Sequence, residues 1–570
     1  MSTPAEPPSP GASFAPSETG EYTHRQILTI ITGLMMGMFL GALDQTIVST
    51  AIRTISDDLH GLSIQAWVTT AYLITSTIAT PIYGKLGDLY GRKKLFMFAI
   101  SLFIAGSALC SFATSMYMLA AFRAVQGIGA GGLFTLVLAI IGDIVSPRER
   151  ARYTGYFMAT FGTSSVLGPV IGGFFASHAV ILGLTGWRWV FLVNVPIGIA
   201  ALYVVYRTLH VRHERRDTRI DWWGAASLIV TLVPLLTVLE QGRVWGWTSG
   251  RSLACFVVAV AGLAAFVAVE LRMHDAALLP LRMFRVRSIS VGIGASLVVG
   301  IAMFGGIMIL PLYMQIVQGA SPMESGFLML PMVVGMMSAS IISGQVISRT
   351  GHIRGFPIFG SGLAAAALLL LSRITADTDL VLVMAVMLLL GYGLGNCMQP
   401  LLLILQSAVP PRDIGVATAS ATFFRQIGGT IGVAVFITLL FATVGDHIHQ
   451  AIGNESHDPV FRSAVAQAST GHDPVARGVA ESILHPGHHG AVAQVQDDSS
   501  FIQKLPDALA HPFKAGFADS MDGVFLLAGL LMALGFLVLW LMPHVELRAT
   551  SAAAAVRSEA APTAPVTEQL

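Results

Sequence analysis

Residues 84–94 read GKLGDLYGRKK and join two long apolar stretches of the chain. Glycine permits a tight turn and lets two helices approach closely, and this stretch has three of them, Gly84, Gly87 and Gly91. Asp88 can lie at the start of the next helix, where a carboxylate is favourable, or pair with Arg92. The basic residues that follow are typical of a cytoplasmic loop. The stretch therefore predicts a turn between two membrane-spanning helices, and a charged turn with no further role is the simpler alternative.

The composition around this turn is that of a membrane protein. The chain has 570 residues, of which 54% are hydrophobic and 11% charged, and its mean hydropathy is +0.71. A soluble domain carries about 25% charged residues, so most of this chain must lie in a medium other than water. The net charge of +1 provides no basic surface for nucleic acid.

Apolar runs that are long enough to cross a bilayer predict fourteen transmembrane helices and an all-α fold. A helix needs about 20 such residues to span the hydrocarbon core. The runs are continuous rather than alternating, which excludes a β-barrel. The predicted spans lie near residues 27–52, 66–84, 95–114, 117–141, 153–176, 189–206, 222–241, 252–271, 290–314, 325–347, 356–374, 379–405, 415–444 and 522–543.

The basic residues orient these spans. With the N-terminus inside, 22 Lys and Arg residues fall in inside segments and 9 in outside segments, and only Arg123 and Arg425 fall within spans. This excess predicts that both termini are cytoplasmic. Arginine greatly outnumbers lysine and alanine is abundant, as is typical of a GC-rich bacterial genome. The predicted location is therefore a bacterial inner membrane.

An internal repeat indicates how the spans are grouped. Two sets of glycines recur at offsets of 264 and 260 residues: Gly127, Gly129 and Gly131 as Gly391, Gly393 and Gly395, and Gly84 and Gly91 as Gly344 and Gly351. Glycine-rich helices match one another easily, but agreement at two places with nearly one offset favours duplication. The repeat predicts two six-helix bundles with two further helices inserted between them.

The predicted organisation has five parts. Tails at both ends, rich in small and polar residues and proline, are expected to be disordered and cytoplasmic. The parts are a tail at 1–24, an N-terminal bundle at 25–207, the inserted pair at 208–285, a C-terminal bundle at 286–545 that includes an external loop at 445–521, and a tail at 546–570.

Further motifs lie within other predicted spans. RAVQGIGAGG at 123–132 embeds an arginine in the membrane, and LDQTIVSTAI at 43–52 embeds an acid. SSVLGPVIGG at 164–173 has four residues that allow close helix contact or a bend: Gly168, Pro169, Gly172 and Gly173. With GKLGDLYGRKK, these segments resemble signature motifs of the major facilitator superfamily, in its fourteen-helix drug:proton antiporter branch. The resemblance covers about residues 25–545, and departs from the family pattern at Ser164, where glycine is usual, and at Arg53, where proline is usual.

The resemblance implies the major facilitator fold and proton-coupled efflux of drugs by alternating access, as in multidrug or antibiotic resistance. It implies that Gly84, Gly87, Asp88, Gly91 and Arg92 form a gating motif, and that the 164–173 segment is the antiporter motif. The chain has no G-x-x-x-x-G-K-[ST] loop for ATP. The proton gradient is thus the expected energy source, and no cofactor or metal is expected.

Asp44 and Arg123 are the predicted proton-coupling pair. An ionisable side chain within a span is costly and by default marks function. The helical rise places Asp44 about 10 Å and Arg123 about 9 Å below the outer face, so the two can meet. Arg123 favours the charged form of Asp44 and burial favours the neutral form, which suits a site that takes up and releases a proton. A static ion pair is the alternative. Glu240, near the outer end of its span, is a second candidate and could equally be an interfacial carboxylate.

Polar residues within other spans are predicted to line a substrate cavity. Each of them taken alone is as typical of a contact between helices. They are Gln45, Gln126, Asn194, Gln315, Asn396, Gln399 and Arg425.

The external segment 445–521 contains eight of the chain's 16 histidines. A metal site or a pH sensor is one interpretation. Their irregular spacing and the absence of cysteine from the segment favour a solvated, flexible loop instead. A docking site for an unidentified envelope partner is a third interpretation.

The sequence thus predicts efflux of small hydrophobic, cationic compounds in exchange for protons, by a monomer in the lipid bilayer. The cation preference rests on Asp44 and Glu240. One alternative keeps the fold and exports a lipid, siderophore or secondary metabolite, with Arg123 and Arg425 binding anionic groups. Another is a non-transporting membrane sensor or scaffold. An enzyme is not expected, because no nucleophile–base or metal constellation stands out.

Overall fold

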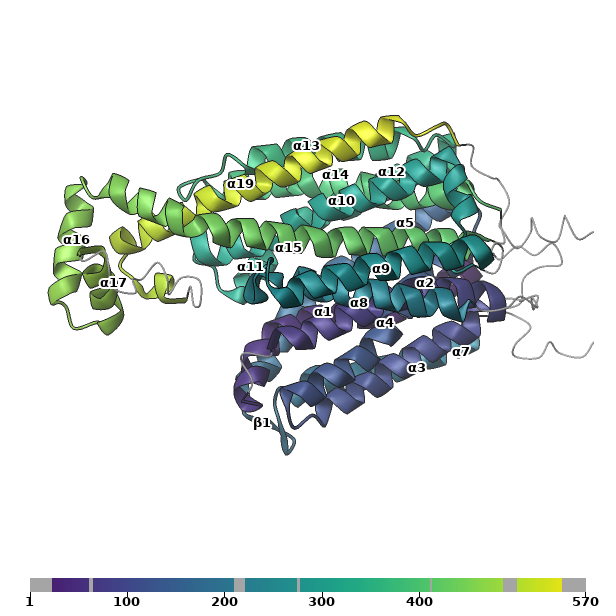
Figure 1. Ribbon diagram of the computed structural model, residues 1–570, viewed down its shortest axis with the longest axis horizontal. Coiled ribbons are helices and arrows are strands. Elements are labelled where there is room, and N and C mark those ends of the chain that lie inside the picture. Colours follow the sequence, from purple (N-terminus) through teal and green to yellow (C-terminus); the bar gives the residue numbers. More distant parts are fainter. Residues whose placement is uncertain are drawn as a thin grey trace, which may run out of the picture.

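The computed structural model describes residues 23–60, 65–209, 221–273, 277–410, 413–484 and 500–545. These residues form long helices that run along one axis of an elongated molecule (Figure 1). Residues 1–22 and 546–570 of the predicted tails, and His485, His488 and His489, lie outside the described residues.

The first helices, which are drawn in purple and blue in Figure 1, come from the predicted N-terminal bundle. A short antiparallel hairpin, β1 (Val180–Ile181) and β2 (Leu184–Thr185), interrupts them and was not predicted. The helices are α1 (His24–Asp58), α2 (Gln65–Tyr90), α3 (Arg92–Ser111), α4 (Met116–Ile144), α5 (Pro147–Ser177), α6 (Arg188–Leu192) and α7 (Asn194–Thr208).

The inserted pair and the remaining helices follow. Two short single-turn elements, a 3₁₀ helix at Leu281–Arg285 and a π-helix at Tyr313–Val317, flank α10. The helices are α8 (Trp222–Trp245), α9 (Gly250–Met273), α10 (Arg287–Leu312), α11 (Pro322–Leu328), α12 (Leu330–Thr350), α13 (Gly355–Leu371), α14 (Leu380–Ser407), α15 (Ile414–Glu455), α16 (Pro459–Thr470), α17 (Pro474–Leu484) and α19 (Asp507–Trp540), with a 3₁₀ turn at Ser500–Lys504 before the last.

Polar residues at the helix starts explain several of these boundaries. The Ser115 hydroxyl accepts from Met118 N at 3.2 Å, which satisfies one of the free N–H groups at the start of α4. Asp379 does the same at α14, where it accepts from Val381 N at 2.8 Å. Gly91 separates α2 from α3 and has φ +92°, a backbone conformation that side chains rarely adopt. The predicted turn at 84–94 is therefore only one residue long.

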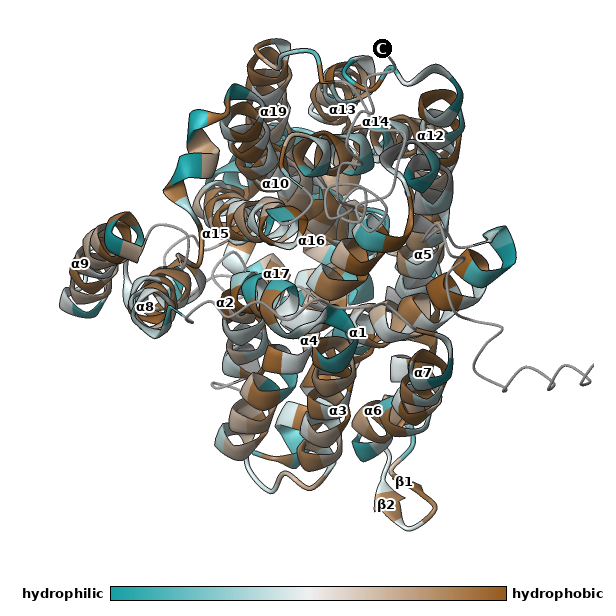
Figure 2. Cartoon of the chain, turned by 90° about the vertical axis from the view of Figure 1, so that its right-hand side faces the viewer, coloured by the Kyte–Doolittle hydropathy of each residue, from teal (hydrophilic) through white to brown (hydrophobic). Residues whose placement is uncertain are grey.

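The helices pack in two groups and an attached pair. We call α1–α7 the N-terminal group and α10–α19 the C-terminal group, because most helix contacts are made within each. The groups meet mainly where α5 packs on α12 and where α2 packs on α15. α8 and α9 pack on each other, and α8 also contacts α2 and α15, so the pair lies on one flank of the molecule (Figure 2). The domain boundaries at 207 and 285 stay predictions.

The repeated glycines occupy matching positions in the two groups. A Cβ on Gly129 of α4 would lie 2.6 Å from Phe103 N of α3, and one on Gly393 of α14 would lie 2.6 Å from Ala364 N of α13. Their neighbours Gly127 and Gly391 pack in the same way against α2 and α12. Each glycine thus permits two backbones to touch, which is how small residues hold membrane helices together.

Twelve helical segments of the described chain are long and apolar enough to cross a membrane. They include α6 joined to α7 and α11 joined to α12. The predicted spans at 66–84 and 356–374 form α2 and α13; α2 is not among the twelve, and α13 has only 17 residues. The all-α polytopic fold is confirmed, and the number of fourteen spans stays a prediction.

The predicted external loop at 445–521 is largely helical, and its prediction as a flexible loop was wrong for the described residues. α15 has 42 residues, or about 63 Å at 1.5 Å per residue, twice the thickness of a bilayer core. Its end, α16, α17 and the start of α19 project beyond the other helices, at the left of Figure 1. We call this the appendage end, and the opposite end, where α2 turns into α3, the motif end.

Short apolar stripes hold the appendage together. α16 buries Phe461, Val465 and Ala468, which share one face of the helix. At the base of the appendage, His511 of α19 contacts two carboxylates: its Nδ1 is 2.5 Å from Glu455 Oε1 and its Nε2 is 3.3 Å from Asp377 Oδ1. Within the described part of the chain, no His, Cys, Asp and Glu side chains gather as a set of metal ligands.

Candidate proton-coupling and gating sites

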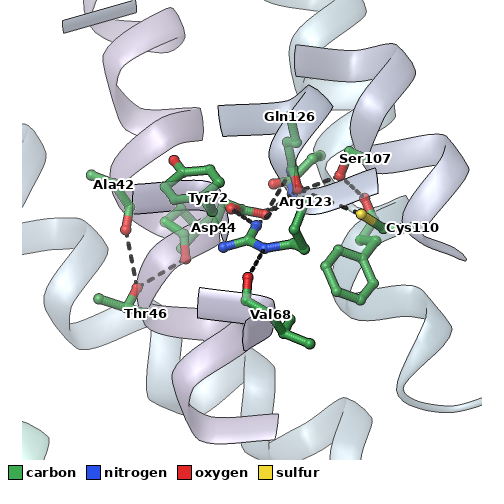
Figure 3. A network of polar contacts seen from close by, with 12 residues as sticks. Ala42, Asp44, Thr46, Val68, Tyr72, Ser107, Cys110, Arg123 and Gln126 are labelled. Atoms are coloured by element: carbon green, nitrogen blue, oxygen red, sulfur yellow. Dashed lines mark hydrogen bonds and ion pairs between the residues drawn. The ribbon is translucent and has the colours of Figure 1, made fainter. Parts of the chain in front are cut away.

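Asp44 and Arg123 lie in direct contact inside the N-terminal group. The Arg123 Nη1 donates to Asp44 Oδ2 at 2.5 Å, and both side chains are almost completely buried (Figure 3). Two amides complete the shell of the carboxylate: Gln126 Nε2 and Asn194 Nδ2 each donate to Oδ1 at 2.9 Å. The predicted meeting of Asp44 with Arg123 is thus present in the geometry, and its coupling role stays a prediction.

Arg123 is itself held by three different kinds of contact. Its Nη1 also donates to Gln126 Oε1 at 2.8 Å, and its Nε donates to the Val68 carbonyl at 3.5 Å. The Tyr72 ring lies 4.0 Å from the guanidinium carbon, a cation–π arrangement (Figure 3). The residues that form and surround the pair belong to α1, α2, α4 and α7, so the Asp44–Arg123 contact lies where four helices meet.

The hydrogen-bond network around Asp44 has one acceptor without a partner among the described residues. Asn194 Nδ2 donates both to Asp44 and to Ser107 Oγ, at 3.1 Å, while its Oδ1 has no hydrogen-bond partner among the described residues. Three donors satisfy a charged Asp44 carboxylate. A neutral carboxyl would place its own O–H against one of those donors, so protonation favours a rearrangement of the shell.

The antiporter motif packs on α1 directly beside this site. A side chain on Gly168 would collide with the Thr46 hydroxyl, and a Cβ on Gly172 would lie 2.7 Å from the Ile47 carbonyl. Thr46 Oγ1 donates to the Ser164 carbonyl of α5 at 3.1 Å. Pro169 lies inside α5, and Gly173 has open space around it. Because Thr46 follows Asp44 by two residues, α5 contacts α1 close to the Asp44 site.

The gating motif contacts the C-terminal group at the motif end. Asp88 Oδ1 pairs with Arg92 Nη2 at 2.8 Å, and Asp88 Oδ2 accepts from Val416 N, in the first turn of α15, at 3.2 Å. Arg92 Nη1 also pairs with Asp143 Oδ2 at 2.8 Å. A side chain on Gly415 would collide with the Asp88 carboxylate. The carboxylate therefore sits at the positive end of the α15 dipole, which favours a negative charge.

A second contact between the two groups at this end was not predicted as a site. Arg150 of α5 donates to Gln406 Oε1 of α14, and both side chains are buried. This contact could not be predicted from the sequence, because a basic residue at the end of a span is typical of the positive-inside rule and does not indicate a partner.

The predicted cavity residues are dispersed. Gln126 and Asn194 belong to the Asp44 shell, Gln45 is exposed on α1, and Asn396 donates to its own helix at the Tyr392 carbonyl. Gln315 lies in the π-helix, where its Nε2 donates to Ser325 Oγ at 3.4 Å. Gln399 lines a small pocket at the motif end, and Arg425 is half-buried in α15. Glu240 lies in α8, and its side chain is outside the described residues.

Curated relatives match nearly the whole chain. The chain is 35% identical over 527 residues to the multidrug transporter protein MdtP of Bacillus subtilis, covering 91% of this chain and 93% of that protein. It is 32% identical over 533 residues to multidrug resistance protein 3 of Bacillus subtilis, covering 92% and 96%. An uncharacterized MFS-type transporter of Mycobacterium tuberculosis is 33% identical, covering 91% of this chain and 70% of its own length.

Solved structures share the fold at low sequence identity. The proton:xylose symporter XylE matches with a TM-score of 0.58 at 15% identity, covering 94% of this chain and 100% of its own. The human organic anion transporter MFSD10 matches with a TM-score of 0.54 at 14% identity, covering 89% and 99%. The family profile of the Major Facilitator Superfamily matches residues 34–433. Together with two helix groups that meet along α2, α5, α12 and α15, these matches show that the chain belongs to the Major Facilitator Superfamily, whose members are membrane transporters.

Proposed function

We propose that this protein exports small hydrophobic, cationic compounds in exchange for protons. The observation that carries the proposal is the completely buried Asp44 carboxylate, held by one guanidinium and two amides. An ionisable group is costly at such a position, so its presence there indicates a functional role. Two relatives that match nearly the whole chain are named for multidrug transport or multidrug resistance, which supports efflux of this class of compound.

The proposed cycle alternates the access of the site between the two ends of the molecule. Contacts of Asp88 and Arg150 with α15 and α14 join the two groups at the motif end. We assign the motif end to the cytoplasm, with both termini there, because the basic residues concentrate in the segments predicted to be inside. Protonation of Asp44 on α1 rearranges the shell of side chains around it, and the α1–α5 contact carries that change to the interface between the groups.

Inverted membrane vesicles provide the test of this proposal. In such vesicles, respiration acidifies the interior, so a drug:proton antiporter accumulates its substrate inside. Ethidium should accumulate when the gradient is present and leave when a protonophore is added. A panel of cationic, neutral and anionic dyes tests the cation preference. Equal accumulation of all charge classes would contradict the cationic substrate, and accumulation that persists with protonophore would contradict proton coupling.

A further inference from the structure

A small pocket lies between the two helix groups at the motif end. Leu138 and Phe157 line it from the N-terminal group, and Ser343 and Gln399 line it from the C-terminal group. All four lie within about three turns of the motif end of their helices. The pocket has room for an occupant about the size of one or two water molecules. It is separate from the Asp44 network, which lies wholly inside the N-terminal group.

Arg150 supplies a buried positive charge to this pocket. The side chain is 5% exposed, and within the described part of the chain its guanidinium donates only to neutral oxygens: Gln406 Oε1 and the carbonyls of Gly142, at 2.8 Å, and Val145, at 3.0 Å. Its Nε has no hydrogen-bond partner among the described residues. A buried guanidinium that meets no carboxylate and keeps a free N–H is unfavourable, because both its charge and its donor remain uncompensated.

The acceptors around Arg150 are fixed in place. Gln406 Nε2 donates to Thr418 Oγ1 at 2.7 Å, which holds the Gln406 Oε1 toward Arg150. Asp143, a carboxylate one residue after Gly142, is engaged by Arg92 at 2.8 Å. The protein around the pocket therefore compensates Arg150 with dipoles and leaves its charge without a counter-ion in direct contact.

We propose that this pocket binds a small monovalent anion, of the size of chloride or formate, against the Arg150 Nε. The charge of Arg150 selects an anion, the size of the pocket excludes larger ones, and the Gln399 amide provides a further donor group on the opposite wall. Because both helix groups line the pocket, a bound anion stabilises the arrangement in which they are joined at the motif end.

Thermal unfolding of the purified full-length protein tests the proposal without measuring transport. Sodium chloride should raise the apparent Tm in a saturable way relative to sodium gluconate at equal ionic strength, because only a ligand that fits the pocket stabilises the folded state. A parallel titration with sodium formate distinguishes a halide site from a carboxylate site. Equal curves of apparent Tm against concentration for chloride, formate and gluconate would overturn the proposal and would indicate that the pocket holds water rather than an anion.

Three variants test whether the effect of chloride on the apparent Tm arises at this pocket. Arg150→Met should weaken the apparent affinity for the anion by about tenfold or more, the loss expected for a charge-assisted hydrogen bond. Ser343→Leu fills the pocket while it keeps Arg150, so it should cause a similar loss and serves where Arg150→Met does not fold. Arg349→Met removes an exposed cation at the same end of α12 and should leave the titration unchanged. Retention of the chloride effect in a folded Arg150→Met or Ser343→Leu protein would show that Arg150 acts only as a contact between the two groups.

Discussion

Asp88 of α2 accepts a hydrogen bond from the backbone N–H of Val416, 328 residues away, at 3.2 Å. The contact joins the gating motif of the N-terminal group to the first turn of α15 in the C-terminal group. The same carboxylate pairs with Arg92, which in turn pairs with Asp143 on α4. Asp88 thus links α2 directly to α15, and through Arg92 it is also linked to α4.

Replacing Asp88 by Asn should slow transport by about tenfold or more while the protein still inserts and folds. The amide keeps the shape and can still accept from Val416 N, but it loses the ion pair with Arg92 and the favourable interaction with the α15 dipole, each a charge-assisted contact of about 1–3 kcal/mol. Initial rates of dye uptake in inverted vesicles, normalised to protein level, measure the effect. Asp57→Asn, at an exposed acid of α1, is the matched control. Wild-type rates for Asp88→Asn would limit the motif to a role in topology.

The close helix contacts at the matching glycines of the two groups lead to a second prediction, which concerns stability. Gly129→Ala and Gly393→Ala should each lower the apparent Tm of the purified protein, since the added Cβ would lie 2.6 Å from a neighbouring backbone nitrogen and overpacking costs about 1–3 kcal/mol. Gly173→Ala, where no atom lies within 4 Å, should leave the Tm unchanged or raise it slightly. A similar loss in all three variants would show that helix contacts are not the cause.

The orientation of the molecule can be tested with single cysteines. In a Cys255→Ser background, the native thiols that remain, Cys110 and Cys397, are buried. A membrane-impermeant maleimide added to intact cells should label His472→Cys, exposed between α16 and α17, and should spare Arg349→Cys, exposed at the motif end of α12. Permeabilised cells should label both. Labelling of Arg349→Cys in intact cells would reverse the proposed orientation.

The level of two residues relative to each other along their helices could be predicted from the sequence, but their direction around the helix could not. Counting the helical rise from the span ends predicted that Asp44 and Arg123 lie at one level. In the structure, Arg123 Nη1 lies 2.5 Å from Asp44 Oδ2. Gln126 and Asn194 were predicted as cavity residues, and the sequence did not indicate that both hydrogen-bond Asp44. Which side of a helix faces a neighbour is set by packing in three dimensions, because a helix surrounded by lipid and other helices has weak hydrophobic periodicity.

The helices of the appendage were not predicted from the sequence for a different reason. The pattern that indicates their starts is local, whereas the prediction for residues 445–521 rested on the composition of the whole segment. Asp458 and Asp473 each precede a proline, and both act as N-caps, accepting from Val460 N and Val475 N at 2.9 Å. An Asp–Pro pair followed by an apolar stripe is the pattern of a helix start. Reading those caps, rather than the histidine content, predicts α16 and α17.

The last prediction concerns proton coupling. Antiport requires that proton and substrate disfavour each other's binding, and thermodynamic reciprocity then links the two gradients. Asp44→Asn removes the titratable charge at nearly constant size, and the single oxygen of the amide can still accept from Arg123. It should abolish accumulation of substrate against a gradient and the release of protons on substrate addition, measured with a pH indicator and purified protein. Downhill exchange should remain. Undiminished proton release from a folded Asp44→Asn protein would exclude Asp44 as the coupling acid and make Glu240 the next residue to substitute.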